Sequence, residues 1–205
     1  MMLKVFTIFF IFLFTYSVDG IGQDKTYSLS VAGKDIGKLK VFELKKINDI
    51  TVQKVESEFK FLFQTGKFVN ESSFSKGRLL EARSIHSING NVKEITNTKL
   101  LPSNHYKVIF SENNSEKKEI KSLQKNIHGT LTGLFYSEPV GSQEVYSERF
   151  GVFCPVKLIA AGSYEVRMPD GKRNVYTYEK GECNQLQTEL AGFKLLLVLD
   201  KKTSL

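Results

Sequence analysis

The residue types that carry most enzymatic and metal chemistry are few in this chain, and their spacing is unfavourable for it. The three histidines are His86, His105 and His128, and none has a second His, Cys, Asp or Glu at a metal-ligand spacing. The segment around Ser163 lacks the second glycine of a nucleophile elbow, and no glycine-rich phosphate loop occurs. The sequence therefore predicts no catalytic residue, no metal ligand and no cofactor.

Charged residues are abundant, but their arrangement is typical of a solvated surface. The chain has 29 Lys and Arg against 22 Asp and Glu, a net charge of +7, and the two signs alternate, as in Lys54-Val55-Glu56. This mixing argues against nucleic-acid binding, whereas weak attraction to an acidic membrane face or an acidic partner stays open. A hydrolase that uses two carboxylates is the weakest alternative, because the pairing of carboxylates depends on geometry.

The two cysteines are Cys154 and Cys183. A disulfide needs Cα atoms within about 7 Å of each other. If the last strands form a simple meander, these residues lie at opposite ends of the sheet, and we expect no bond. An exported protein permits a disulfide; pairing would then require a strongly curled sheet or another strand order.

Aromatic and aliphatic side chains are the remaining candidates for function. Phe59, Phe61 and Phe63 share one face of a predicted strand over Ile50–Phe63, which is followed by a turn at Gly66. A second apolar stripe, at helical spacing, consists of Leu123, Ile127, Leu131, Leu134 and Phe135. It predicts one short helix, stopped by Pro139, whose apolar stripe must be covered by a sheet face.

Two interpretations of these side chains remain open. They form either an ordinary core beneath the helix or a concave apolar surface that accepts an acyl chain or another apolar ligand. The candidate ligand-contacting residues are Phe59, Phe61, Phe63, Leu131, Leu134 and Phe135. An apolar cavity of about 300 Å³ or more beneath the last three would favour ligand binding.

Alternation of apolar and polar residues dominates the rest of the chain and predicts short antiparallel strands. Asn89-Gly90 indicates a tight hairpin, and Pro169-Asp170-Gly171 indicates a second turn. We expect one mostly β domain over residues 23–205, with about ten strands and one short helix.

The amino-terminal segment predicts export. Lys4 precedes an apolar run from Val5 to Phe14, and small residues follow, a pattern typical of a secretory signal peptide over residues 1–22, cleaved after Gly20 or Gly22. The run is shorter than the roughly 20 residues of a membrane span, so an uncleaved anchor is the less favoured alternative. No cysteine lies near either cleavage site, which predicts a soluble mature protein without a lipid anchor or stable membrane span.

Three segments carry a family resemblance: Arg149–Phe153, Tyr164–Gly171 and Asn174–Tyr178. Gly181 belongs to the same pattern, as does the strand followed by a glycine-containing turn over Tyr27–Gly37. Across residues 26–199 the chain resembles a family of exported Gram-negative bacterial proteins of unknown function. Related exported families look like the periplasmic lipoprotein carrier and receptor, so the resemblance implies a strongly curved antiparallel half-barrel or open barrel with the helix packed on or inside it.

The resemblance also implies a periplasmic location and the handling of an apolar ligand or a lipoprotein. The leading hypothesis is a non-catalytic binding or chaperone-like module whose partner is a lipid, another apolar ligand or an envelope protein. The alternative is a structural or interaction protein of the cell envelope, whose concave face is filled by its own helix.

Overall fold

The fold is an antiparallel sheet that wraps around one turn of helix. The computed structural model describes residues 25–42, 44–112 and 118–200, so the predicted signal peptide over residues 1–22 lies outside the described residues. The elements are β1 (Lys25–Val31), β2 (Lys34–Val41), β3 (Lys45–Ile47), β4 (Ile50–Phe61), β5 (Gln64–Ser75), β6 (Arg78–Ile88), β7 (Asn91–Leu100), β8 (Tyr106–Glu112), β9 (Lys118–Leu123), the 3-10 helix η1 (Thr132–Phe135), β10 (Glu144–Ser147), β11 (Val152–Ala160), β12 (Ser163–Arg167), β13 (Arg173–Glu179), β14 (Glu182–Leu190) and β15 (Phe193–Leu199).

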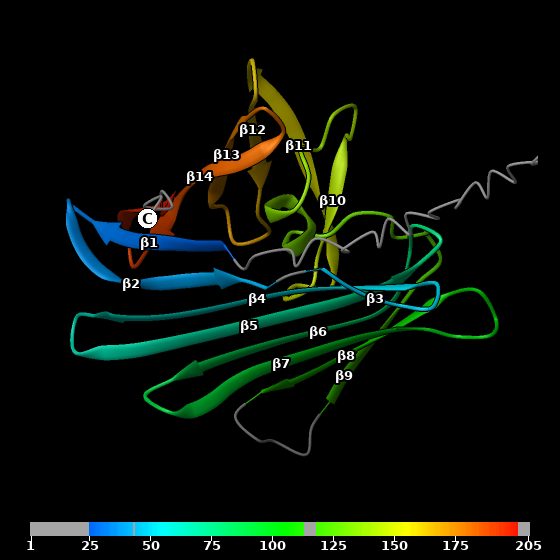
Figure 1. The fold of residues 1–205 in the computed structure, drawn as a ribbon. Coiled ribbons are helices and arrows are strands. Elements are labelled where there is room, and N and C mark those ends of the chain that lie inside the picture. The colour runs from blue at the N-terminus through cyan, green and yellow to red at the C-terminus, as the bar shows by residue number, and fades with distance from the viewer. Residues whose placement is uncertain (1–24, 43, 113–117, 201–205) are drawn as a thin grey trace, which may run out of the picture.

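The strands form two meanders joined along one seam. Their order is β10-β11-β12-β13-β14-β15-β1-β2-β4-β5-β6-β7-β8-β9, with β3 paired to β4 outside this path. The seam is the antiparallel pair of β1 and β15, in which Leu29 lies opposite Leu197. Figure 1 shows the long strands β4–β9 as one wall, from which β10–β14 rise as a second. The prediction of a mostly β, single antiparallel open sheet is confirmed.

The predicted number of about ten strands is wrong, because the described residues alone form a sheet of fifteen. The strands that were missed lie at margins: β9 and β10 are the two ends of the strand order, and β3 pairs only with β4. Edge strands are kept short and charged, which blocks pairing with other chains and also weakens the alternation that reveals a strand. In β9, for example, Glu119, Ile120 and Lys121 are all exposed, so buried and exposed residues do not alternate there.

Tight hairpin turns connect many of the strands. Two-residue turns with positive φ at both residues occur at Ala32-Gly33, Lys76-Gly77, Asn89-Gly90, Lys180-Gly181 and Ala191-Gly192. These are the turns whose twist suits a hairpin, and glycine adopts their left-handed backbone without strain. The hairpin predicted at Asn89-Gly90 is confirmed.

The turn predicted at Gly66 is wrong. Gly66 lies inside β5, and the chain reverses instead at Leu62 and Phe63, with φ of 47° and 66°. The strand before the turn therefore ends at Phe61, and Phe63 leaves the stripe that it was expected to share with Phe59.

The predicted helix is also wrong: Leu123 ends β9, and the described residues contain a single 3-10 turn, η1, in place of an α-helix. The backbone between them bonds to strands. Leu79 N–H donates to Ile127 O at 2.9 Å, and Tyr146 N–H donates to Gly129 O at 2.9 Å. Gly129 and Gly133 weaken a helix, and here the neighbouring strands offer the backbone other partners.

Despite its short length, η1 lies on the concave side of the sheet, in contact with β4, β5 and β14 (Figure 1). Tyr178 Oη donates to Leu134 O at 2.7 Å. The Phe135 ring meets Tyr27 and Tyr176 edge to face, with centroids 5.3 and 5.9 Å away. These contacts hold η1 against the seam side of the sheet.

The second meander curls back over the first. The hydroxyl groups of Thr98 on β7 and Tyr146 on β10 are 2.7 Å apart, and Thr96 Oγ1 donates to Arg149 O at 2.7 Å. These contacts join the two walls across the interior and give the open sheet a barrel-like shape.

Among the residues that the structure describes, no helix is long and apolar enough to cross a membrane.

Candidate functional site

A cavity of about 400 Å³ lies inside the curved sheet, between its two walls and η1. Its apolar surface comes from inward-facing positions of strands on both sides of the seam and from η1 with the residue before it. These residues are Leu29, Leu39, Val55, Phe59, Phe68, Leu131, Phe135, Leu186, Leu190, Leu195 and Leu197. Cavities of this size that are lined mainly by apolar side chains are typical of small-molecule sites.

Phe59 is positioned by two glycines. It lies opposite Gly37 on β2 and opposite Gly66 on β5. A Cβ atom at Gly66 would lie 2.3 Å from Phe59 Cζ, and one at Gly37 would lie 2.6 Å from Phe59 Cα. The ring therefore occupies space that a side chain on β5 would need, which explains a glycine inside a strand.

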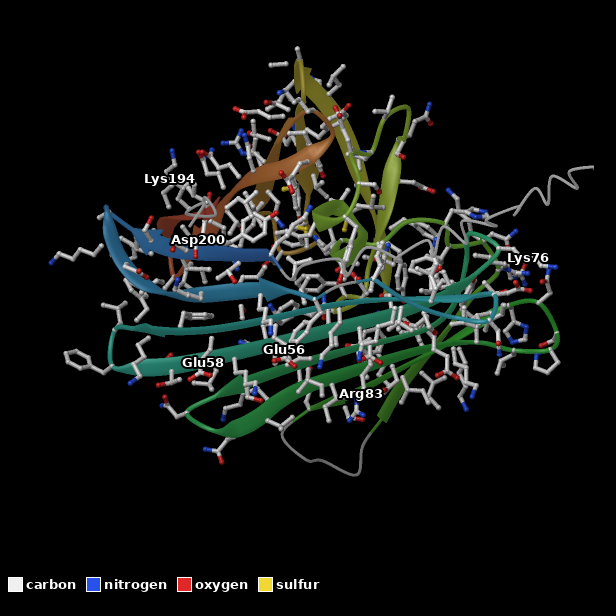
Figure 2. The ribbon with its side chains drawn as sticks, in the orientation of Figure 1. Glu56, Glu58, Lys76, Arg83, Lys194 and Asp200 are labelled. Carbon is white, nitrogen blue, oxygen red and sulfur yellow. The ribbon has the colours of Figure 1, made fainter. Side chains whose placement is uncertain are left out.

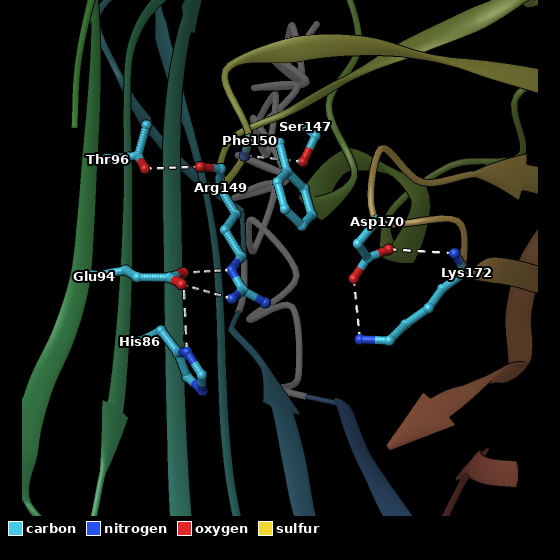
Figure 3. A network of polar contacts seen from close by, with 8 residues as sticks. All are labelled: His86, Glu94, Thr96, Ser147, Arg149, Phe150, Asp170 and Lys172. Carbon is cyan, nitrogen blue, oxygen red and sulfur yellow. Dashed lines mark hydrogen bonds and ion pairs between the residues drawn. The ribbon is translucent and has the colours of Figure 1, made fainter. Parts of the chain in front are cut away.

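A polar rim of four residues occupies one side of the cavity: His86 on β6, Arg149 after β10, and Asp170 and Lys172 in the turn between β12 and β13. Figure 3 shows two ion pairs facing each other across this region. Arg149 donates two hydrogen bonds to Glu94, from Nε at 2.6 Å and from Nη2 at 2.9 Å. On the other side, Lys172 Nζ lies 3.0 Å from Asp170 Oδ2.

The charges around the rim follow from these contacts. The hydrogen bonds from Arg149 hold the pKa of Glu94 below its ordinary value. Burial, together with the Arg149 charge, lowers the pKa of His86, whose Nδ1 lies 3.9 Å from Glu94. Burial opposes ionisation of Asp170, but the hydrogen bonds from Lys172 lower its pKa overall. The rim thus combines two balanced ion pairs with a neutral imidazole at neutral pH.

One carboxyl group lies buried behind the cavity wall. Glu148 is 1% exposed, and its Oε1 accepts hydrogen bonds from Thr132 N–H at 3.1 Å and from Ser72 Oγ at 3.3 Å. Its Oε2 has no partner among the described residues. Burial raises the pKa of this carboxyl group, as expected for an acid that lacks a cationic neighbour.

Three of the six predicted ligand-contacting residues, Phe59, Leu131 and Phe135, line the cavity. Leu134 is buried on the other side of η1, where it borders a second, more polar cavity of about 520 Å³.

The other two predicted contacts lie elsewhere. Phe61 packs edge to face on Phe193, with centroids 5.5 Å apart. Phe63 is 104% exposed at the turn and faces solvent, so its assignment to the concave surface is wrong.

Cys154 on β11 and Cys183 on β14 are both buried and carry free thiols. The strands between them follow the predicted meander, with β11, β12, β13 and β14 side by side. Burial raises the pKa of the Cys154 thiol to about 11 and that of the Cys183 thiol to about 12. Buried, protonated thiols of this kind are unreactive.

The polar rim was missed by sequence reasoning, although a signal was present. Arg149 and Asp170 both fall within the segments that carry the family resemblance, and the sequence predicted a turn at Asp170 but no functional role for either residue. Their convergence with His86 joins segments more than 60 positions apart, which no local pattern reveals. Within the described parts of the chain, no three His, Cys, Asp or Glu residues are grouped so that they could hold a metal ion.

The fold and the cavity define a class of protein: a barrel-like, antiparallel β domain with an internal apolar cavity. The structure is similar to the crystal structure of a beta-barrel-like protein of domain of unknown function DUF1849 from Brucella abortus, with a TM-score of 0.54 over 87% of this chain and 95% of that chain. The identity is 11%, so the likeness concerns the fold alone.

The chain itself belongs to the family of domain of unknown function DUF6134, whose model matches residues 27–200. No curated protein matches the sequence.

Proposed function

We propose that this protein is a non-catalytic binding or chaperone-like module that acts in the periplasm after export and holds an apolar ligand, either a lipid or the acyl part of a lipoprotein. One observation carries the proposal: an apolar cavity of about 400 Å³ remains open beside η1, above the volume at which ligand binding becomes plausible. Each methylene group of a bound chain would gain about 0.8 kcal/mol from leaving water.

The polar rim adds to this proposal. Ligand sites combine an apolar pocket with a few polar groups that fix orientation. Here the apolar walls lead to His86, Arg149 and Lys172 on one side. An amphiphile, with its chain among the leucines and its polar head at the rim, fits this arrangement.

The second candidate is a structural or interaction protein of the cell envelope. It is favoured by η1, which fills part of the concave side with the protein's own residues Leu134 and Phe135. A carboxylate-dependent hydrolase has the least support, because Glu94 and Asp170 are each engaged by a cation.

Filling the cavity tests ligand binding. Ser57 is buried on β4 and lines the cavity, so Ser57→Phe would place a phenyl ring inside it. The matched control is Ser73→Phe on β5, at a half-exposed position outside the cavity lining. We expect a fluorescent fatty acid to bind the wild type and the control alike, and Ser57→Phe at least roughly tenfold more weakly, since its apolar contacts are lost.

Equal binding by the two variants, with both folded by circular dichroism, would exclude this cavity as the site. Native mass spectrometry of the purified protein provides a second measurement, in which a co-purified lipid should appear with the wild type and be depleted in Ser57→Phe. A wild-type protein that binds no apolar probe would favour the structural alternative.

Export is tested separately by sequencing the amino terminus of the protein recovered from the periplasmic fraction. Cleavage after Gly20 gives a chain that begins at Ile21, and cleavage after Gly22 gives one that begins at Gln23. Recovery of the uncleaved chain in the membrane fraction would contradict the proposed location.

A further inference from the structure

The turn between β4 and β5 is unlike the other tight hairpin turns. Leu62 and Phe63 both have positive φ, yet neither is glycine, and their exposed fractions are 58% and 104%. In the described chain, every other two-residue turn with positive φ at both residues has glycine second. Bulky side chains disfavour the left-handed backbone. Neither side chain is buried against the described chain, so no packing there offsets the cost of the left-handed backbone. This points to a contact outside the chain.

This turn lies at an end of the barrel that the cavity lining reaches. Phe59, two residues before the last residue of β4, lines the cavity, as does Leu190, which pairs with Phe193 at the β14–β15 turn. Figure 1 shows the β1–β2, β4–β5 and β6–β7 turns at the same end of the molecule. Phe193 is 49% exposed and packs on Phe61, so a second aromatic side chain extends the apolar tip.

Lysines surround the tip. Lys60 and Lys67 flank it on β4 and β5, and Lys34 and Lys194 lie beside the neighbouring turns; all four are exposed. Lys194 is labelled near this end in Figure 2, with Lys76 at the opposite end. None of the four forms an ion pair with any part of the chain that the structure describes.

Acidic residues on the same segments are fewer. They are Asp35, Glu58 and Glu189, and the last two face Lys67 and Lys194 across the strand register without pairing with them. The four lysines therefore exceed the three carboxylates around the apolar tip by one positive charge.

We propose that this docking tip, formed by Leu62, Phe63 and Phe193 with Lys34, Lys60, Lys67 and Lys194, binds an anionic lipid surface. The two turn residues insert among the headgroups, the lysines meet anionic lipids, and the end of the cavity lined by Phe59 and Leu190 faces the bilayer. This inference rests on the proposed function, because it names a membrane as the place where the apolar ligand is collected or delivered.

The shape and chemistry of the tip favour lipid over protein. A hairpin tip with few apolar side chains offers little of the roughly 1,600 Å² that a stable protein interface buries. Reversible membrane binding instead needs a small apolar insertion of about 5–10 Å depth combined with basic residues. The tip supplies both.

Sedimentation with vesicles tests the proposal. We expect the mature wild-type protein to bind vesicles that contain phosphatidylglycerol, and to bind more weakly to phosphatidylcholine alone or at high salt. The double variant Leu62→Asn/Phe63→Gly installs the residues that a tight hairpin prefers. It should lose roughly tenfold or more in vesicle binding, because apolar insertion is lost, while its urea midpoint stays the same or rises.

Two further variants separate the contributions. Lys60→Gln/Lys67→Gln should weaken binding to the anionic vesicles and reduce its salt dependence. Val140→Asn is the apolar control, since Val140 is 74% exposed in the loop before β10, away from the tip, and the change should leave binding unaltered.

The fluorescent fatty acid, measured without vesicles, separates this inference from the proposed function. Leu62→Asn/Phe63→Gly should bind the probe as the wild type does. If the wild type binds the probe but no vesicles, membrane docking is overturned and the cavity proposal stands. If it binds vesicles but no probe, ligand binding in the cavity is overturned and membrane docking stands. If the double variant abolishes self-association in sedimentation velocity instead, the tip contacts a second copy and the lipid proposal is overturned.

Discussion

The ring of Phe59 on β4 occupies the space that a side chain on Gly66 of β5 would fill, since a Cβ atom there would lie 2.3 Å from Phe59 Cζ. Gly66 is thus part of the cavity wall, and it fixes how far the Phe59 ring extends over β5. Gly66, a residue without a side chain, therefore helps to determine the shape of the cavity.

Gly66→Ala should therefore force the Phe59 ring to move and destabilise the protein by about 1–3 kcal/mol, the usual range for overpacking. Urea denaturation measures the change. Gly129→Ala is the matched control, because its Cβ would meet Val145 at an ordinary 3.9 Å. Replacing Phe59 with Leu should recover part of the loss in the Gly66→Ala background, and equal stability of the two alanine variants would contradict this account.

The Arg149–Glu94 ion pair should stabilise the contact between the turn after β10 and β7. Both side chains are about one-third exposed, at 31% and 37%, so we expect Glu94→Gln to cost about 1 kcal/mol at neutral pH. Because the Glu94 pKa is lowered in the folded state, this contribution is present above the ordinary value of 4.5 and is lost as the pH falls through the folded-state pKa.

The measurement for Glu94 is the difference in unfolding free energy between wild type and Glu94→Gln from pH 7 to pH 3. The difference should shrink at the acidic end. Glu81→Gln, which removes an ion pair between two well-exposed side chains, is the control and should have a smaller effect at neutral pH. A difference that does not change with pH would argue against the ion pair as its cause.

Glu148 should give the opposite pH dependence. Its pKa is raised by burial, so stability is full below the ordinary value of 4.5 and falls as the pH rises above it, until the folded-state group ionises as well. Glu148→Gln keeps an acceptor for the Thr132 and Ser72 donors and removes the titration.

We therefore expect the unfolding free energy of Glu148→Gln, relative to wild type, to increase between pH 4 and pH 8. Denaturant titrations at several pH values measure it. Glu71→Gln, at an exposed position on β5, should show no such trend. A wild-type curve parallel to that of Glu148→Gln across this range would mean that Glu148 is ionised in the folded protein.

The thiols of Cys154 and Cys183 should be unreactive in the native protein, because both are buried and their pKa values are raised. Ellman's reagent should label neither thiol under native conditions and both in denaturant. Absence of labelling in denaturant without reductant would reveal a disulfide, and with it either a sheet that curls more strongly or a strand order other than the meander.

Patterns within short stretches of the sequence were sufficient to predict much of the sheet. Alternation predicted most strands of both meanders, though not β3, β9 and β10, and Asn89-Gly90 predicted its hairpin, because strand pairing and tight turns depend on residues that are neighbours in the chain. The same reasoning failed for Gly66, which was assigned to a turn, because its reason for being glycine is the Phe59 ring on the adjacent strand. It failed for the stripe from Leu123 to Phe135 because strands distant in sequence bind that backbone.

By itself, then, the sequence determined that this is an antiparallel β protein with an apolar interior, since period-two patterning and turn residues act over a few positions. Only the tertiary structure decided where η1 lies, that an apolar cavity stays open beside it, and that Phe63 faces solvent. It also brought His86, Arg149, Asp170 and Lys172 to one rim. Those properties depend on how strongly the sheet curves and on which segments meet across it, and curvature is the sum of many strand twists and bulges that no single segment encodes.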